Sequence, residues 1–490
     1  MSCKKLQSKT LNSGGKMKRE IMVNSSVGQT RVAIMEDGVL SDIFIERSES
    51  AKIVGNIYKA SVENILPGIS SAFLDAGLEK NAYIFVDDVR VNSKERKIEK
   101  LLTRSQEVMI QIDKEPISTK GPKVTMDISL PGRNLVYMPF SSNIGISKNI
   151  FKKDERDRLR SIVMAARPDD GGFIIRTEAE GASEKELKRE IVYLHRLWGS
   201  IGARFNKAKA PALLHKDLGV TFQTVRDYLN EDVEVLLIDD EEELKDVKNF
   251  VNIVSPELIE KIKLYNAKTP LFKAFGIEET IKKLRSHRVS LPSGGSIIIQ
   301  EAESLCAIDV NTGKFAGKKS QEETVTANNI EAAKEIAKQL RLRNIGGIIV
   351  IDFIDMKKSK NRAKVLEAIS VAVKGDKAKI NILPITRLGL IEMTRERRRE
   401  SLLSQMTENC PECSGTGLVL SRETLFIHIC DELSKMRLSE HNGKVKIRLR
   451  KEVAEYFKER IPRLKKISGG NIEIQHAPEL SWEDYQIIVE

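Results

Sequence analysis

Carboxylate and amide side chains occur at the ends of two short apolar segments of the chain. The segment Ala307–Asn311 alternates apolar and other residues, which places Asp309 and Asn311 on one face of a predicted strand. The segment Ile348–Asp352 is an unbroken apolar run that ends in Asp352, a pattern typical of a strand buried on both faces. Buried carboxylates need a partner, and Mg²⁺ is commonly held by one or two carboxylates together with water and substrate phosphate. The spacing therefore predicts a magnesium site.

Each aspartate also has a simpler explanation. An aspartate that follows a strand often caps a helix or closes a turn, and this interpretation is favoured for Asp309 or Asp352 taken alone. Together with Asn311 the two form a convergent set of oxygen donors, which favours the metal. The nearby Asp355 is interpreted either as a supporting carboxylate or as a turn residue.

A second motif contains two cysteines three residues apart. Cys410 and Cys413, followed by Ser-Gly-Thr-Gly, can chelate one tetrahedral zinc ion, which requires four ligands. The nearest further candidates, His428 and Cys430, lie two residues apart on a predicted helix, Thr424–Lys435, and so point to roughly opposite sides. The motif therefore predicts a four-cysteine site shared by two copies of the chain. A redox role is the alternative, but the strand-to-helix context of redox motifs is missing.

Aromatic and basic residues in the first half of the chain suggest contacts with a polyanion. Tyr58, Phe73, Tyr83 and Phe85 lie in short strands rich in glycine, where they could stack on bases or fill a core. Arg176 and Thr177 end a predicted strand, and a guanidinium with a hydroxyl matches phosphate oxygens, although a solvated arginine is an equal alternative.

The composition limits the class of protein. A length of 490 residues suggests about three or four domains, and the excess of 81 basic over 70 acidic residues, +11, favours polyanion partners. Five cysteines form no disulfide framework, which favours the cytosol. No segment approaches the ~18 apolar residues of a membrane span, and no phosphate-binding loop of the nucleoside triphosphatases occurs. Residues 1–17 are expected to be a disordered extension without a signal sequence, and Met17 is an alternative start.

The elements that would position these residues follow from periodicity. Strand, helix and strand in succession, with the helix at Glu322–Arg343, predict a βαβ-type layer in which Asp309 and Asp352 lie side by side. The other predicted elements are a hairpin at Ile21–Glu46, a small barrel at Val54–Ile112, helices at Asp154–Ala166 and Ser183–Trp198 around a strand at Gly171–Thr177, a strand at Val233–Ile238, and a turn entering a strand at Leu291–Ile299.

These features together resemble the bacterial ribonuclease E/G family, in its short form without a long disordered tail. The resemblance runs from about Lys18 to Ser421 and fades from about Arg422 onward. Its most specific segments are Gly68–Asp75, Leu291–Ile299, Ala307–Asn311, Gln339–Arg343, Gly346–Met356 and Cys410–Gly417.

The resemblance implies a multidomain α+β and α/β architecture. It consists of an RNase H-like fold with an inserted S1-like (OB) barrel, a 5′-sensor domain, a DNase I-like catalytic domain, a zinc link and a small C-terminal dimerisation domain. The expected boundaries are 18–51 with 221–284 for the RNase H-like domain, 52–126 for the barrel, 127–220 for the sensor, 285–406 for the catalytic domain, 407–417 for the zinc link and 418–490 for the C-terminal domain.

The resemblance also implies roles for individual residues. Asp309 and Asp352 are similar to magnesium ligands, and Asn311 is similar to the residue that orients the scissile phosphate or the attacking water. Cys410 and Cys413 are similar to the shared zinc ligands.

RNA contacts are implied at two further places. The barrel residues that resemble those holding RNA beside the metal are Phe73, Tyr83 and Lys120. The residues that resemble a pocket for a 5′-monophosphate are Gly132, Val136, Arg176, Thr177 and Lys379. Tyr83 replaces the phenylalanine of an enterobacterial-type member and keeps the stacking surface. Lys379 replaces an arginine and loses its bidentate fork.

The expected function is that of a magnesium-dependent endoribonuclease. It would cleave single-stranded RNA, respond to a 5′-monophosphate end, and act in rRNA maturation and mRNA decay in the cytoplasm. Attack by water would leave 5′-phosphate and 3′-hydroxyl ends. Mg²⁺ and Zn²⁺ are the expected cofactors, and shared zinc implies a homodimer or homotetramer. The alternatives are a non-catalytic S1-type RNA-binding protein and a magnesium-dependent DNA nuclease.

Overall fold

The computed structural model describes residues 18–26, 28–47, 53–90, 96–115, 120–313, 321–397, 399–436, 444–469 and 471–489. It contains two compact units, Met1–Gln405 and Met406–Glu490. The extension expected at residues 1–17 lies outside the described residues. Among the described helices, none combines the length and the apolar character needed to cross a membrane.

A five-stranded sheet of the first unit joins two stretches of chain that lie far apart in the sequence. Its strand order is β15-β14-β1-β2-β3, and β1 is parallel to β14 and antiparallel to β2. The elements here are β1 (Arg19–Ser26), β2 (Gln29–Glu36), β3 (Val39–Arg47), β14 (Val233–Ile238) and β15 (Ile262–Leu264), with α4 (Val220–Tyr228), α5 (Glu241–Val254), α6 (Leu271–Ala274) and α7 (Ile277–Leu284). The hairpin predicted at Ile21–Glu46 is confirmed in β2 and β3, which are antiparallel and reverse at Asp37 and Gly38. A second reversal between Ser26 and Gln29, which the prediction lacked, makes β1 a third strand.

A closed barrel follows the first three strands, as the sequence predicted. Its strands run in the order β4-β5-β6-β8-β7, and β4 pairs with β7 to close it. The elements are β4 (Ile57–Leu66), β5 (Ser71–Asp75), β6 (Ala82–Phe85), α1 (Ile98–Leu101), β7 (Glu107–Lys114) and β8 (Lys123–Thr125), and β13 (Ala212–His215) joins β4 from outside. Apolar side chains, including Tyr58, fill its core.

A four-stranded sheet with two helices comes next. Its strand order is β11-β12-β10-β9. The elements are β9 (Leu130–Pro131), β10 (Leu135–Met138), β11 (Ile144–Ile146), α2 (Lys153–Ala166), β12 (Gly172–Ile175) and α3 (Glu184–Lys207). Helix α3 begins at a capping box in which Ser183 accepts from the backbone of Glu186 and the Glu186 side chain accepts from that of Ser183. Both predicted helices and the strand between them are confirmed.

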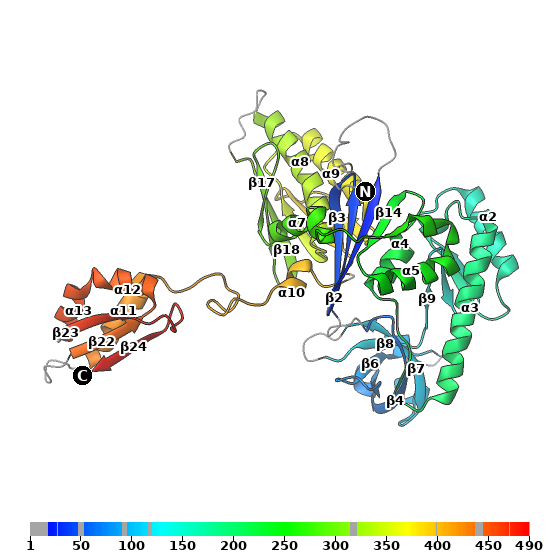
Figure 1. Ribbon diagram of the computed structural model, residues 1–490, viewed down its shortest axis with the longest axis horizontal. Helices are drawn as coiled ribbons and strands as arrows, with labels where there is room; N and C mark the ends of the chain where they lie inside the picture. The colour runs from blue at the N-terminus through cyan, green and yellow to red at the C-terminus, as the bar shows by residue number, and fades with distance from the viewer. Residues whose placement is uncertain are drawn as a thin grey trace. The chain divides into compact units, whose positions relative to one another are not determined.

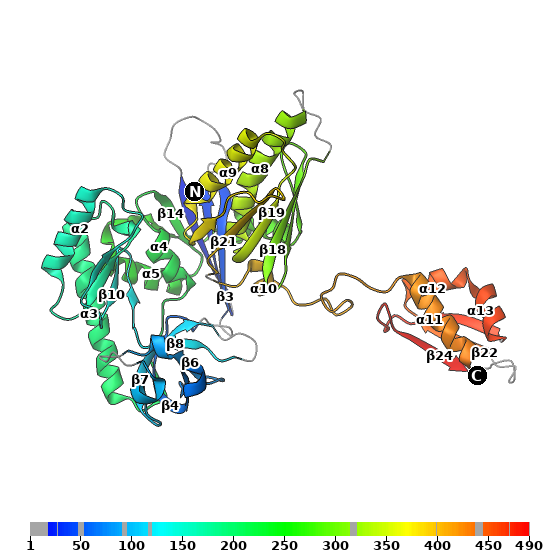
Figure 2. The ribbon, with the colours of Figure 1, turned by 180° about the vertical axis from the view of Figure 1, so that it is seen from behind.

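A six-stranded mixed sheet carries the acidic residues. Its order is β16-β17-β18-β19-β21-β20, and the neighbours β18 and β19 are parallel and joined by α8, as predicted. The elements are β16 (Arg288–Ser290), β17 (Ser296–Glu301), β18 (Leu305–Asn311), α8 (Gln321–Leu342), β19 (Gly347–Asp352), α9 (Ser359–Ala372), β20 (Ile380–Ile382) and β21 (Leu390–Arg395), followed by α10 (Leu402–Met406). Figures 1 and 2 show α8 and α9 side by side along this sheet.

Only one face of this sheet is covered by the helices. Ile349 and Ile351 of β19 are fully buried against the helical layer, whereas Ile348 is 52% exposed on the other face. The expectation that β19 is buried on both faces is therefore wrong. An apolar run is compatible with either environment, and here one face of the strand remains open.

The second unit is a small α/β fold. Its sheet has the order β23-β22-β24, with β22 parallel to β23 and antiparallel to β24. Its elements are α11 (Arg422–Lys435), β22 (Lys444–Leu449), α12 (Lys451–Lys458), α13 (Ile461–Ser468), β23 (Asn471–His476) and β24 (Tyr485–Val489). Helix α11, predicted from residue 424, begins two residues earlier, at Arg422. Its N-cap is Ser421, whose side chain accepts from the backbone N–H of Thr424.

Candidate functional site

The two acidic strand ends meet at one edge of the six-stranded sheet. Asp309 of β18 is the direct register partner of Asp352 of β19, so the two residues lie side by side. Alternation along β18 places Asn311 on the same face as Asp309, and its Nδ2 donates to Asp309 Oδ2 at 2.6 Å. The sequence prediction that these three residues converge is confirmed by their geometry.

The carboxylates differ from the expectation in one respect. Asp309 and Asp352 are exposed, not buried, because they lie on the face of β18 and β19 that the helices do not cover. Within the described ranges, no group of three or more His, Cys, Asp or Glu side chains is gathered closely enough to hold a metal. Two carboxylates and one amide nevertheless fit Mg²⁺, which commonly completes its shell with water and phosphate oxygens. Asp355 is exposed as well.

Two buried asparagines of α8 connect the helix to the loops beside the carboxylates. The amide of Asn329, with no exposed surface, donates to Ile354 O at 2.8 Å and accepts from Ile354 N at 3.2 Å. Asn328 lies so close to Gly295 that a Cβ there would be 2.3 Å from its Oδ1. The same Cβ would be 2.8 Å from Asn311 O, so only glycine fits between the helix and the end of β18. The chain segments on both sides of the acidic pair are thus held by α8.

The barrel presents a row of aromatic side chains. Phe73 of β5 and Tyr83 of β6 are direct cross-strand partners and are half-buried. The ring of Tyr83 contacts Phe85 edge-on, with centroids 5.5 Å apart, and Phe85 is 42% exposed. Lys120 is exposed in the segment that returns to pair beside Tyr83. Bases of a single strand can stack on such a surface.

Arg176 follows β12 and is held by the turn between β9 and β10. Its Nη1 donates to Gly132 O at 2.6 Å and contacts Asp227 Oδ1 at 2.9 Å, and its backbone N–H donates to Asn134 O at 2.8 Å. Thr177 forms a hydroxyl hydrogen bond of 2.8 Å with Ser147. Val136 lies on β10, two residues from Asn134. The structure thus brings Gly132, Arg176 and Thr177 to one region.

Lys379, predicted for the same pocket, has no described contact with Arg176. Its side chain is exposed, and its backbone pairs with Glu396 because the residue extends the edge of β20 toward β21. The lysine beside Arg176 is Lys377, whose Nζ contacts Glu178 at 3.3 Å and donates to the backbone oxygen of Asp227. Burial lowers the pKa of Lys377, partly opposed by Glu178 and Asp227.

Asp227 is the anionic centre of this cluster. Burial alone would raise the pKa of Asp227, but hydrogen bonds from Arg226 and the charges of Arg226, Arg176 and Lys377 lower it to about 2. Arg226 donates to both carboxylate oxygens at 3.0 Å. The cluster therefore holds three cations around one carboxylate.

The cysteine motif belongs to the second unit. Cys410 is exposed and Cys413 half-exposed, and the pKa of Cys413 is lowered by N–H groups of Gly417 and Gly415 and by the Cys410 thiol. His428 is exposed whereas Cys430 is buried in the core, which confirms that these two point to opposite sides of α11. Glu412, between the cysteines, accepts from Trp482 N at 2.9 Å and pairs with Arg450 at 2.6 Å. The motif is thereby attached to its own unit.

The sequence interpretation missed several residues of these sites, among them Lys377, Asp227 and Asn329. Asn329 had a usable signal, because an amide on the apolar face of an amphipathic helix must find partners in the core. Lys377 had none, because local pattern does not distinguish two lysines that are two residues apart in a loop.

Comparison with known proteins gives two family matches. The model described as the Ribonuclease E/G family matches residues 129–398. The model described as RNase E/G, Thioredoxin-like domain matches residues 409–490.

Individual relatives agree with these matches. The chain is 37% identical over 486 residues to ribonuclease G of Haemophilus influenzae. The matched region covers 96% of this chain and 99% of that protein. It is 35% identical over 488 residues to ribonuclease G of Escherichia coli K12, with 96% and 100% covered. It is also 39% identical to ribonuclease E of a Nostoc species, over 74% of this chain and 54% of that protein.

Proposed function

Because the chain belongs to the ribonuclease E/G family, we propose that it is an endoribonuclease that cleaves single-stranded RNA with the help of Mg²⁺. The observation that carries the proposal is the pairing of Asp309 with Asp352 on adjacent parallel strands, with Asn311 on the same face. The tasks we assign to the enzyme are rRNA maturation and mRNA decay in the cytoplasm.

The side chains divide the work at the phosphodiester. Magnesium, when bound, supplies Lewis acidity and a more acidic water, and Asp309 and Asp352 are the residues that would hold it. One N–H of the Asn311 amide donates to Asp309, which fixes the direction of that carboxylate. The second N–H can donate to a phosphate oxygen, and the carbonyl oxygen can accept from the attacking water. The expected products carry 5′-phosphate and 3′-hydroxyl ends.

The barrel is proposed to hold the RNA strand. Phe73 and Tyr83 offer adjacent half-buried rings, and Lys120 adds an exposed positive charge. Unpaired bases can turn toward such rings, whereas paired bases cannot, which favours single-stranded substrates.

The region around Arg176 is proposed to recognise a 5′-monophosphate. Gly132, Val136, Arg176 and Thr177 stay the predicted contacts, and Lys379 stays a prediction for the same pocket. The position of Lys377 beside Arg176 supports a role for this lysine as a second cation. A terminal phosphate dianion would compete with Glu178 and Asp227 for these two charges.

The domain assignments and the assembly are part of the same proposal. The two-segment sheet of β1–β3 with β14 and β15 supports an RNase H-like domain at 18–51 and 221–284, and the layer around α8 supports a DNase I-like domain at 285–406. Cys410 and Cys413 would bind Zn²⁺ together with the same pair from a second copy, giving a homodimer or homotetramer.

Replacement of the two carboxylates tests the nuclease. Asp309→Asn and Asp352→Asn are each expected to lower the rate of cleavage of a fluorescent RNA oligonucleotide about 10²-fold or more, because each removes a charged oxygen at the reacting phosphate. Asp169→Asn, at an exposed loop position before β12, is the control and should cleave normally.

Two outcomes would contradict the proposal. Unchanged cleavage by both variants, or cleavage independent of magnesium, leaves only the non-catalytic S1-type RNA-binding alternative. Equal cleavage of a DNA oligonucleotide of the same sequence would favour the DNA nuclease.

A further inference from the structure

One carboxylate lies in the interior of the sensor region, behind the turn that holds Arg176. Glu190, on the second turn of α3, is only 4% exposed. It falls on the apolar stripe of this helix, between Leu187 and Leu194, where a carboxylate is unexpected. A charged group at such a position requires a specific set of donors.

The donors all come from the turn between β9 and β10. Glu190 Oε1 accepts from Asn134 N at 2.9 Å and from Leu135 N at 3.2 Å. Its Oε2 accepts from the Asn134 side-chain amide at 2.9 Å and from Asn134 N at 3.1 Å. Gly132 lies directly on the carboxylate, because a Cβ there would be 2.0 Å from Glu190 Oε1. The carboxylate is therefore in direct contact with the backbone of Gly132 and hydrogen-bonded to Asn134 and Leu135.

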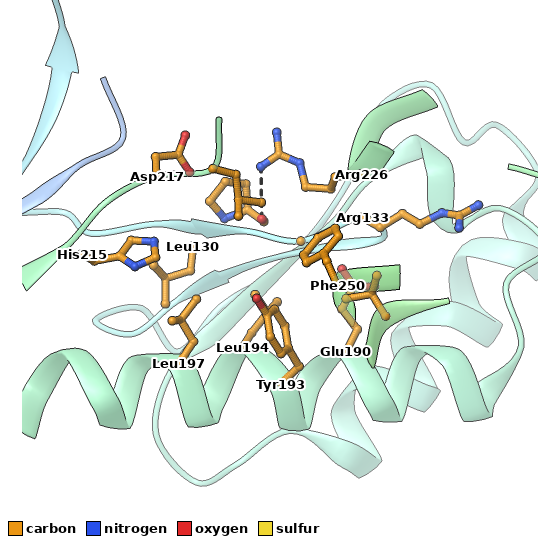
Figure 3. A pocket seen from close by; sticks show the side chains of 14 residues that line it. Leu130, Arg133, Glu190, Tyr193, Leu194, Leu197, His215, Asp217, Arg226 and Phe250 are labelled. Carbon is orange, nitrogen blue, oxygen red and sulfur yellow. Dashed lines mark hydrogen bonds between the residues drawn. The ribbon is translucent and has the colours of Figure 1, made fainter. Parts of the chain in front are cut away.

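A cavity of about 40 Å³ lies beside the carboxylate and behind the same turn. It is lined by the turn residues Gly132 and Arg133 and, from the opposite side, by Tyr193 and Leu194 of α3. Figure 3 shows Glu190, Tyr193, Leu194 and Leu197 extending from the same side of α3, with Leu197 near Leu130 and Glu190 near Phe250. On this side of the turn, the side chain that binds the backbone N–H groups of Asn134 and Leu135 is Glu190.

The turn between β9 and β10 also holds Arg176 at two points. Gly132 O accepts from the guanidinium at 2.6 Å, and Asn134 O accepts from the backbone N–H at 2.8 Å. Gly132 N also donates to Leu135 O at 2.8 Å, which closes the turn on itself. Asn134, which Glu190 binds, and Gly132, which Glu190 contacts, therefore hold Arg176 together with Asp227.

We propose that Glu190 is a positioning residue for recognition of the RNA 5′ end. It holds the Gly132–Leu135 turn so that Arg176 meets a terminal phosphate in a fixed orientation. The inference rests on the proposed 5′-monophosphate pocket and extends it to a residue that touches no substrate.

The test compares two RNAs of identical sequence, one with a 5′-monophosphate and one with a 5′-hydroxyl. For each enzyme variant the ratio of the two kcat/KM values is the readout, so the 5′-hydroxyl RNA is an internal reference. Glu190→Gln keeps the size of the side chain but turns one acceptor into a donor that faces backbone N–H groups. The ratio is expected to fall about tenfold, which is the effect of losing one charge-assisted hydrogen bond. The fall should come from a higher KM for the phosphorylated RNA.

Two further variants keep the test decisive. Glu184→Gln makes the same chemical change on the exposed side of the same helix, where Glu184 pairs only with Lys188 of α3 among the contacts described, and it should keep the wild-type ratio. Asn134→Ala removes one donor to Glu190 but leaves the carboxylate in place, and it should lower the ratio to a smaller extent. If thermal unfolding shows that Glu190→Gln is not folded, the ratio measured for Asn134→Ala decides the test.

The outcomes separate this inference from the proposed function. A wild-type ratio of one would overturn the 5′-monophosphate pocket and the role of Glu190 with it. A wild-type preference that Glu190→Gln or a folded Asn134→Ala leaves unchanged would overturn the role of Glu190 alone. An equal loss on both RNAs would show that Glu190 serves stability only, which also overturns the inference.

Discussion

Single residues around Arg176 show how buried charges are balanced in this chain. Arg176, Arg226 and Lys377 surround Asp227, and Arg176 and Lys377 also contact Glu178. A carboxylate in such a setting contributes to stability only while it is ionised. The stability that Asp227 contributes therefore depends measurably on pH.

Asp227→Asn is expected to destabilise the protein at pH 7 by about 2 kcal/mol. The pKa of Asp227 is lowered from 3.8 to about 2 in the folded protein, and each pKa unit corresponds to about 1.4 kcal/mol. Because the folded pKa is the lower one, this contribution is complete above pH ~4 and is lost as the pH falls toward 2. Urea unfolding at pH 7 and pH 3 should show the difference between variant and wild type shrinking to about half.

A difference that stays constant between the two pH values would contradict this explanation. Asp169→Asn, at an exposed position, provides the control and should change stability little at either pH.

Residue-level prediction from sequence succeeded where spacing carried the information. Asp309, Asn311 and Asp352 are placed by strand alternation and by parallel register, both of which are local consequences of the backbone. Glu190 and Lys377 depend on which distant turn or helix approaches them. Asn134, the partner of Glu190, lies 56 residues from it in the sequence, and Asp227, the partner of Lys377, lies 150 residues from it.

At the scale of elements, α8 connects the parts of the acidic site. Its apolar side, with Ala333, Ile336 and Leu340, packs on the sheet as its periodicity predicted. Its first half carries Asn328 and Asn329 against the loops that flank Asp309 and Asp352. At its other end, Arg341 forms ion pairs with Glu36 and Asp42, which joins the helix to the five-stranded sheet.

Asn329→Ala is expected to weaken the response of the enzyme to magnesium. The variant frees both hydrogen bonds to Ile354, two residues after Asp352, and loss of a group that orients a metal ligand typically costs about 10- to 100-fold in metal affinity. Cleavage rates measured over a magnesium titration should show a higher half-saturating concentration.

Asn361→Ala is the matched control, because its amide donates to the Glu322 side chain and not to the backbone of Ile354. If both variants shift the magnesium titration equally, Asn329 has no special role in placing Asp352.

Elements were predictable where a period was clear. The helices α2, α3, α8 and α11 and the closed barrel follow from apolar spacing and turn residues. The environment of β19 did not follow, because Ile348–Ile351 is apolar throughout and its sequence is the same whether one face or both are covered. The reversal after Ser26 was missed because the flanking strands continue the same alternation.

At the scale of the whole molecule, the second unit holds the cysteine pair. Glu412 fixes the loop of Cys410 and Cys413 to Arg450 and to the backbone of Trp482. The loop is therefore presented from a folded surface of this unit, and its two thiols are available for two of the four positions of a tetrahedral zinc.

Cys410→Ala is expected to lower the oligomeric mass measured by light scattering, and a zinc chelator should do the same to the wild type. Both remove the ion that would join two copies. Cys430→Ala, in the core of the unit, is the control for a cysteine unable to reach the site. A mass that stays the same in the variant and with chelator would refute the shared site.

The open face of the six-stranded sheet has a consequence for how a substrate arrives. Asp309 and Asp352 lie at the surface, and neighbouring Ile348 is half exposed, so a polynucleotide can be laid sideways across the strand ends at any point along its length. Within the described residues, both carboxylates are exposed, so a strand of RNA can reach them without being threaded from a terminus. A covalently closed ring of RNA, which has nothing to thread, would meet the same carboxylates as a linear one.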